Sequence, residues 1–136
     1  MLGSVRYHIR IDAPAALVWS IVGDPASIAS WFPDFEASSV EGTTRTMTAA
    51  SGLSFDEELL VVDGILRRVQ YSLNLPIMSF HRGTMDVLDL GDGTSVVVYA
   101  TDADPRIMAL VIGSATQRAL EEIKVQAEAA ATREDS

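Results

Sequence analysis

The chain has 136 residues and no cysteine, so we expect one domain without disulfide bonds, thiolate metal ligands or a cysteine nucleophile. Hydrophobic residues make up 48% of the sequence and charged residues 21%, which is typical of a globular protein. The net charge of −9 argues against nucleic acid and against an anionic membrane surface as partners, because both attract clustered basic side chains.

The N-terminal residues predict one strand and two short helices. Apolar and polar residues alternate over residues 5–12, which indicates a half-buried strand. Asp12 and Pro14 then predict the start of a helix, with Asp12 as the cap. Residues 23–25, Gly-Asp-Pro, break this helix and begin a second one that runs through Ile28.

Six further strands follow, separated by turns that contain glycine. We expect them over residues 35–41, 43–50, 55–62, 65–73, 80–88 and 94–101. Asp63-Gly64 favours a two-residue type I′ hairpin loop, and Gly91-Asp92-Gly93 favours another hairpin turn.

A long C-terminal helix is predicted from Pro105 to about Ala131, with Asp102 or Asp104 as its cap. Gly113 lies inside it and costs about 1 kcal/mol relative to alanine. Close approach of a ligand or a strand would explain this glycine, and so would a tolerated kink. The apolar stripe of the helix is formed by Met108, Ile112, Ala115, Ala119, Leu120, Ile123 and Ala127.

No crossover helix separates the predicted strands, so the sheet must be antiparallel. We therefore expect an α+β fold, in which a curved seven-stranded antiparallel sheet wraps around the C-terminal helix and leaves an apolar cavity. Two short helices lie between strands 1 and 2. The domain spans residues 1–136, with a polar tail from about residue 132. A cytoplasmic protein is expected, because no apolar run could cross a bilayer or act as a secretion signal. It is expected to be a monomer or a weak homodimer.

Several segments are typical of one known family. They are Ile11-Asp12-Ala13-Pro14 with Val18-Trp19, Trp31-Phe32-Pro33, Asp56-Glu57-Glu58-Leu59 with Arg67-Arg68 and Tyr71, Gly91-Asp92-Gly93-Thr94, and Ala119-Leu120 with Ile123-Lys124. With them the chain resembles the START/Bet v 1-like (SRPBCC) superfamily, and its polyketide cyclase/dehydrase branch in particular. The resemblance implies a helix-grip fold whose cavity holds lipids, sterols, polyketides or similar molecules. Some such relatives are aromatases or cyclases, and many only bind or carry.

The predicted hairpin register defines one wall of this cavity. With Asp63-Gly64 as the loop, Glu58 opposes Val69 and Leu60 opposes Arg67. A bulge would move part of this face to the other side. The predicted inward set is Asp56, Glu58, Leu60, Val62, Ile65, Arg67, Val69, Tyr71 and Leu73.

In this register Glu58 and Arg67 form an inward polar clamp for a ligand, and Tyr71 donates a further hydrogen bond. The alternative is a mutually satisfied pair at a sheet edge, or side chains lying in water at the mouth. Glu57 and Arg68 are expected on the opposite face as a solvated cross-strand pair.

His81 shares its strand face with Gly83 and Met85, which is the predicted inward set. There it could act as a general base near neutral pH. The alternative is a strand-end residue hydrogen-bonded to backbone or water. His8, the other histidine, is expected at the surface.

Trp31, Phe32 and Phe35 flank the second short helix, where they form either a gate or part of the core. No metal or cofactor is expected, because no cluster of histidine or carboxylate residues has ligand spacing. The predicted ligand-binding residues are Glu58, Leu60, Arg67, Val69, Tyr71, His81, Met85, Val98, Met108, Ile112, Trp31 and Phe35.

Three functional hypotheses follow. The first is binding or carriage of a small hydrophobic ligand without catalysis, anchored by the polar residues above. The second is a polyketide cyclase or aromatase, with His81 or Glu58 as acid/base and Tyr71 orienting the substrate. The third is an interaction module whose cavity is collapsed.

Overall fold

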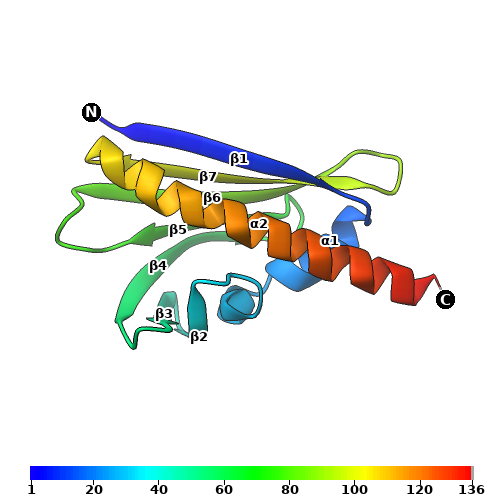
Figure 1. The fold of residues 1–136 in the computed structure, drawn as a ribbon, viewed down its shortest axis with the longest axis horizontal. Helices are drawn as coiled ribbons and strands as arrows, with labels where there is room; N and C mark the ends of the chain where they lie inside the picture. Colours follow the sequence, from blue (N-terminus) through cyan, green and yellow to red (C-terminus); the bar gives the residue numbers. More distant parts are fainter. Residues whose placement is uncertain (136) are drawn as a thin grey trace.

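The computed structural model describes residues 1–135 and contains a seven-stranded antiparallel sheet with one long helix across its concave face (Figure 1). The elements are β1 (Gly3–Ile11), α1 (Ala15–Val22), the 3₁₀ helix η1 (Pro25–Ser30), β2 (Phe35–Glu41), β3 (Thr44–Ala49), β4 (Ser54–Asp63), β5 (Arg68–Leu73), β6 (Phe80–Asp89), β7 (Ser95–Asp104) and α2 (Arg106–Glu134). The strand order is β1-β7-β6-β5-β4-β3-β2. The predicted helix-grip architecture is confirmed.

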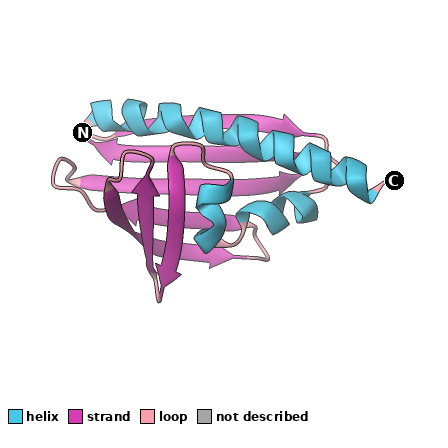
Figure 2. Ribbon diagram, turned by 60° about the horizontal axis from the view of Figure 1, so that its bottom comes forward, coloured by secondary structure: helices cyan, strands magenta, loops and turns pink. Residues whose placement is uncertain are grey.

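The two short helices close the side of the sheet where its edge strands β1 and β2 are far apart (Figure 2). Val18 and Val22 of α1 are buried, as is Ile28 of η1. The core lies between this layer, the sheet and α2. No helix within residues 1–135 is long and apolar enough to cross a membrane.

The predicted caps of the two main helices are wrong. Pro14 and Pro105 precede α1 and α2, and neither helix start receives a side-chain cap. The Asp12 carboxylate accepts a hydrogen bond from Arg10 instead, at 2.7 Å, and Asp102 and Asp104 belong to β7. The C-terminal helix also runs on to Glu134, through most of the predicted polar tail, whose last residue, Ser136, lies outside the described residues.

Small residues let α2 approach the sheet closely. A Cβ atom on Gly113 would lie 2.5 Å from Val5 Cγ2, so the neighbouring strand β1, and not a ligand, accounts for this glycine. The buried side of the helix is formed by Ala109, Gly113, Thr116, Ala119, Leu120, Ile123 and Ala127.

Replacement of Gly113 with alanine is therefore expected to destabilise the protein by about 1–3 kcal/mol through overpacking, although alanine is the better helix former. The midpoint of urea unfolding measures this. Val5→Ala/Gly113→Ala should recover part of the loss because the shorter Val5 side chain makes room for the new methyl group. A single variant more stable than the wild type would contradict the close approach.

The β4–β5 hairpin differs from its prediction. Val62 pairs with Val69 and Asp63 with Arg68, so the loop has the four residues 64–67 instead of two. Asp63 Oδ1 accepts the backbone N–H groups of residues 65 and 66, both at 2.9 Å, and Arg67 adopts a φ of 54°. A bulge lies between Leu59 and Val61. The longer loop removes Arg67 from the strand, and the one-residue bulge changes which face of β4 points inward between Ser54 and Leu59.

Strands β5 and β6 are paired only over a short stretch, from Arg68–Asp86 to Tyr71–Gly83. Beyond that point the backbone pairing between them ends, and the His81 side chain bonds to the Leu73 backbone instead. Gly83 is required at this position because a Cβ atom would overlap the Tyr71 ring that crosses it. One end of the pocket described below lies where the two strands diverge.

Candidate ligand-binding site

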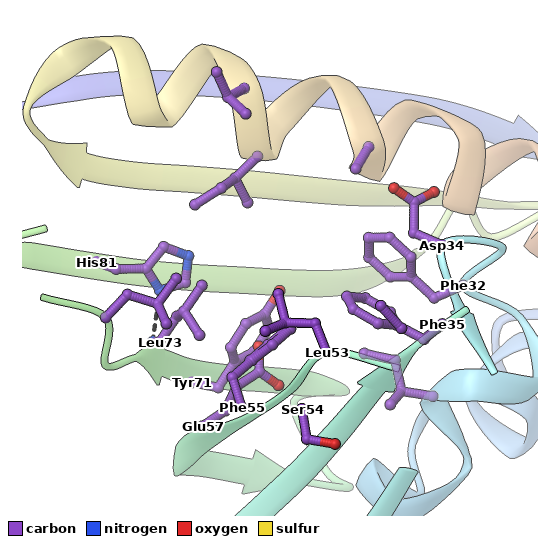
Figure 3. A pocket seen from close by; sticks show the side chains of 16 residues that line it. Phe32, Asp34, Phe35, Leu53, Ser54, Phe55, Glu57, Tyr71, Leu73 and His81 are labelled. Atoms are coloured by element: carbon purple, nitrogen blue, oxygen red, sulfur yellow. Dashed lines mark hydrogen bonds between the residues drawn. The ribbon is translucent and has the colours of Figure 1, made fainter. Parts of the chain in front are cut away.

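A pocket of about 370 Å³ lies between the curved sheet and the N-terminal half of α2 (Figure 3). This volume falls within the range of small-molecule sites. Most of its wall is apolar and comes from the segment before β2, from β3 to β5 and from α2. The apolar wall includes Phe32, Phe35, Leu53, Phe55, Leu73 and Ile112, and the polar wall includes Asp34, Ser54, Glu57, Tyr71 and His81.

A buried ion pair lies beside the pocket. Arg45 of β3 and Glu57 of β4 are register partners, and Arg45 Nε donates to Glu57 Oε1 at 2.8 Å. Arg45 is only 2% exposed; it also donates to the Pro25 carbonyl, and its guanidinium lies 4.7 Å from the centre of the Tyr71 ring. Burial raises the pKa of Glu57, and the attraction of Arg45 offsets part of that shift.

Two tyrosines form a second buried polar contact. The hydroxyl oxygens of Tyr71 and Tyr99 are 2.7 Å apart and share a hydrogen bond. Burial raises the pKa of Tyr71 well above its ordinary value and that of Tyr99 to about 12. Both phenols are therefore neutral at physiological pH, and Tyr71 can offer a ligand a hydroxyl but not a phenolate.

His81 lines the pocket at the point where β5 and β6 diverge. Its Nδ1 accepts the Leu73 backbone N–H at 2.8 Å, which replaces a strand hydrogen bond. Because Nδ1 is an acceptor, the ring proton of the neutral histidine lies on Nε2. Burial lowers the pKa of His81 to about 4, and the nearby Asp102 charge opposes this shift. The Nε2 atom is buried and has no hydrogen-bond partner among residues 1–135.

The predicted general-base role of His81 does not fit this geometry. A base needs a free nitrogen lone pair, and the only one on this ring is occupied by Leu73. The prediction that the side chain points inward is correct, and so is the alternative that it bonds to backbone. Both predictions hold at once because Nδ1 bonds to the Leu73 backbone while Nε2 lies on the side of the ring that faces the pocket (Figure 3).

An aromatic cluster forms the other side of the pocket. The ring centroids of Phe32 and Phe35 are 4.9 Å apart, and those of Phe35 and Phe55 are 5.6 Å apart. Trp31 is 3% exposed, packs 6.4 Å from Tyr99 and belongs to the core instead of the pocket wall. Phe32 and Phe35 thus take part in the site, whereas Trp31 supports it from behind.

Other predicted site residues divide between wall and core. Tyr71, His81, Phe35 and Ile112 line the pocket. Val69 and Met85 are buried register partners in the core. Met108 is half-buried on α2 and is not among the lining residues.

The predicted polar clamp is wrong. Glu58 is exposed and accepts a hydrogen bond from Thr43, Arg67 lies in the β4–β5 loop, and Leu60 is 43% exposed at the bulge. The four-residue loop takes Arg67 out of the strand, and the bulge reverses the face of β4 on which Glu58 lies, since a shift of one residue reverses the face of a strand. Glu58 therefore lies outside the pocket and cannot serve as its acid or base.

The predicted outer pair and one predicted wall residue also need correction. Glu57 is buried with Arg45, while Arg68 bonds to Asp86 at 2.7 Å on the outer face. Val98 pairs with Asp86 in the sheet and shares that outer face. His8 is exposed, as predicted.

Sequence reasoning missed Arg45 and Glu57. A signal for Glu57 was present, because Phe55, Glu57 and Leu59 alternate with more polar neighbours and form an apolar line around one carboxylate. Arg45 shares the parity of Met47, which is fully buried. An inward arginine and glutamate on neighbouring strands could have been proposed as a pair.

Fold and pocket together define a helix-grip protein with an apolar site between sheet and helix. Residues 3–131 match the family described as polyketide cyclase / dehydrase and lipid transport. The chain belongs to this family. No curated protein matches its sequence significantly.

Solved structures with the same fold are similar over nearly the whole chain. XoxI from Bacillus cereus has a TM-score of 0.85 at 19% identity, with 92% of this chain and 95% of that chain covered. The aromatase/cyclase Zhui from a Streptomyces species has a TM-score of 0.78 at 18% identity, with 94% of both chains covered. A START superfamily protein from Mycobacterium smegmatis has a TM-score of 0.75 at 13% identity, with 92% and 97% covered. These likenesses show that the chain shares its fold with these structures.

Proposed function

We propose that this protein binds or carries a small hydrophobic molecule, such as a lipid or polyketide, in the pocket between the sheet and α2. The observation that supports this most is the cavity of about 370 Å³, whose wall is mainly apolar, with few polar groups. Such a wall offers a hydrophobic driving force and a small number of orienting contacts. The family description, which includes lipid transport, is consistent with the proposal.

A cyclase or aromatase activity has less support from the same residues. Glu57 is held by Arg45, His81 lacks a free lone pair, and the phenols resist ionisation. Asp34, the other carboxylate that lines the site, is paired with Arg118, so each candidate base among the lining residues already has a partner. The similarity to an aromatase/cyclase concerns the fold.

Filling the pocket tests the proposal. Ala115 of α2 lines the cavity, and Ala115→Phe should weaken binding of the neutral fluorescent probe phenylnaphthylamine about tenfold or more, because the new ring occupies the ligand's volume. Fluorescence titration measures the Kd. The matched control is Ala129→Phe, which makes the same change at an exposed position of the same helix and should leave the Kd unchanged.

Circular dichroism of both variants verifies that the fold is retained. Equal binding by Ala115→Phe and the wild type would place the probe elsewhere and contradict the proposal. Native mass spectrometry of the protein purified from its own host then identifies the class of bound molecule. A wild-type protein that binds neither the probe nor any host molecule would also reject the proposal.

A further inference from the structure

His81 offers the pocket a hydrogen-bond donor that nothing in the described chain uses. Its Nδ1 is held by the Leu73 N–H at 2.8 Å, so the proton on Nε2 is the ring's remaining polar group. The residue is 5% exposed, and Nε2 lacks a partner among residues 1–135. Figure 3 shows the ring at the pocket wall, with one nitrogen bonded to Leu73 and the other free. A buried donor without an acceptor is costly, so a ligand oxygen at this position would be favoured.

The other charged groups around the pocket are already neutralised. The positive charge of Arg45 is compensated by Glu57 at 2.8 Å, and the guanidinium lies against the Tyr71 ring, outside the residues that line the cavity. At the rim, Asp34 is paired with Arg118 at 2.9 Å. An anionic ligand would therefore be buried without a positive side chain available to pair with it. A cationic ligand would have to compete with Arg45 or Arg118 for a carboxylate that is already paired.

The apolar side of the pocket lies across from His81. The rings of Phe32 and Phe35 are at one side and the His81 ring is at the other, with Tyr71 between them (Figure 3). A molecule that fills this space would place an apolar body on the phenylalanine rings and a single polar atom near Nε2. Stacking on the aromatic rings favours a flat or unsaturated body.

We propose that the ligand is an uncharged molecule with an acceptor oxygen, such as a ketone, ester or ether oxygen, which accepts a hydrogen bond from His81 Nε2. This inference rests on the proposed function. It makes His81 the residue that distinguishes an oxygenated ligand from a hydrocarbon of the same shape. It also explains why the ring is fixed by Leu73, since this contact keeps the donor directed at the cavity.

Two probes of the same shape test the inference. Acetonaphthone carries a ketone oxygen where isopropenylnaphthalene carries a methylene group. The difference between their Kd values therefore reflects the hydrogen bond from His81 Nε2 and the hydration of the ketone in water. His81→Phe removes the donor and keeps a ring. The preference for the ketone, expressed as the ratio of the two Kd values, should fall about fivefold in this variant, which corresponds to about 1 kcal/mol. His81→Gln, which can accept from Leu73 and donate to the ligand, should retain the preference.

Nuclear magnetic resonance of the wild-type histidines provides a measurement that does not depend on the variants folding. The Nε2 signal of His81 should shift with acetonaphthone and stay in place with isopropenylnaphthalene. The exposed His8, the only other histidine, serves as the internal control.

The outcomes separate the two proposals. If neither probe binds the wild-type protein, the proposed function fails and this inference fails with it. If both probes bind but the ratio is unchanged in His81→Phe and the Nε2 signal does not move, the pocket stands and the inference is overturned. Tighter binding of naphthoate than of acetonaphthone would overturn it as well, since the site would then prefer an anion.

Discussion

Replacement of Glu57 with leucine is expected to destabilise the protein by about 3–5 kcal/mol, the largest effect of any single change considered for this chain. The variant leaves the Arg45 guanidinium, which is 2% exposed, without its counter-charge in the interior. The remaining contacts of Arg45, with the Pro25 carbonyl and the Tyr71 ring, do not replace a carboxylate. Urea unfolding followed by circular dichroism measures the loss.

The double variant Arg45→Met/Glu57→Leu is the control for this result. Removal of both charges eliminates the desolvation penalty together with the ion pair, so the double variant should be much closer to the wild type than Glu57→Leu. A single variant as stable as the wild type would contradict the burial of the pair. The comparison Arg68→Met, whose partner Asp86 is on the partly exposed outer face, should cost no more than about 1 kcal/mol.

The second large effect is a loss of stability in acid that depends on His81. Its pKa is about 4 in the folded protein, because burial disfavours the charged ring, and near the ordinary value of 6.5 when unfolded. Between these two values the unfolded chain binds more protons than the folded one, so stability falls as pH falls. The contribution is fully present above about pH 6.5 and is lost by about pH 4, and it amounts to about 3 kcal/mol.

The variant His81→Gln isolates this contribution because glutamine can accept the Leu73 N–H but does not titrate. The difference in unfolding free energy between wild type and variant should change by about 3 kcal/mol from pH 7 to pH 4. The raised pKa of Glu57 acts in the opposite direction, but it is common to both proteins and cancels. A pH-independent difference would show that the folded histidine titrates normally.

The sequence predicted the fold well because the signals for it are local. Residues 35–41 were predicted as a strand, and β2 has those bounds, since alternation and the following Gly42 act within a few residues. Helix α2 was likewise evident from its length and apolar stripe. The exceptions are the helix caps, where both starts follow a proline and use no side-chain acceptor.

The site was predicted only in part because it depends on register. Tyr71 and His81 were placed correctly, since β5 and β6 alternate without interruption. On β4, the Asp-Gly pair suggested a tight turn, but Asp63 instead holds a longer loop through two backbone N–H groups. No local pattern distinguishes these two turns, and the bulge after Leu59 is the shift that reverses the face of β4. The apolar line of Phe55 and Leu59 around Glu57 favours an inward Glu57, but only the bulge seen in the structure decides between this face and the face predicted from the hairpin.

Because β5 diverges from β6 at His81, this side chain both bonds to the backbone of the sheet and lines the pocket. One ring nitrogen completes the backbone pairing of Leu73, and the other is directed at the cavity wall. Few side chains can accept on one side and donate on the other, so a change of ligand preference here is coupled to the integrity of the sheet. Variation in the molecule bound would then be tolerated more easily at the phenylalanine side of the cavity, where substitutions alter shape and leave the backbone pairing intact. The divergence of β5 from β6 thus gives the pocket two different ends. Substitutions at the His81 end affect folding, whereas substitutions at the phenylalanine end change the shape of the pocket alone.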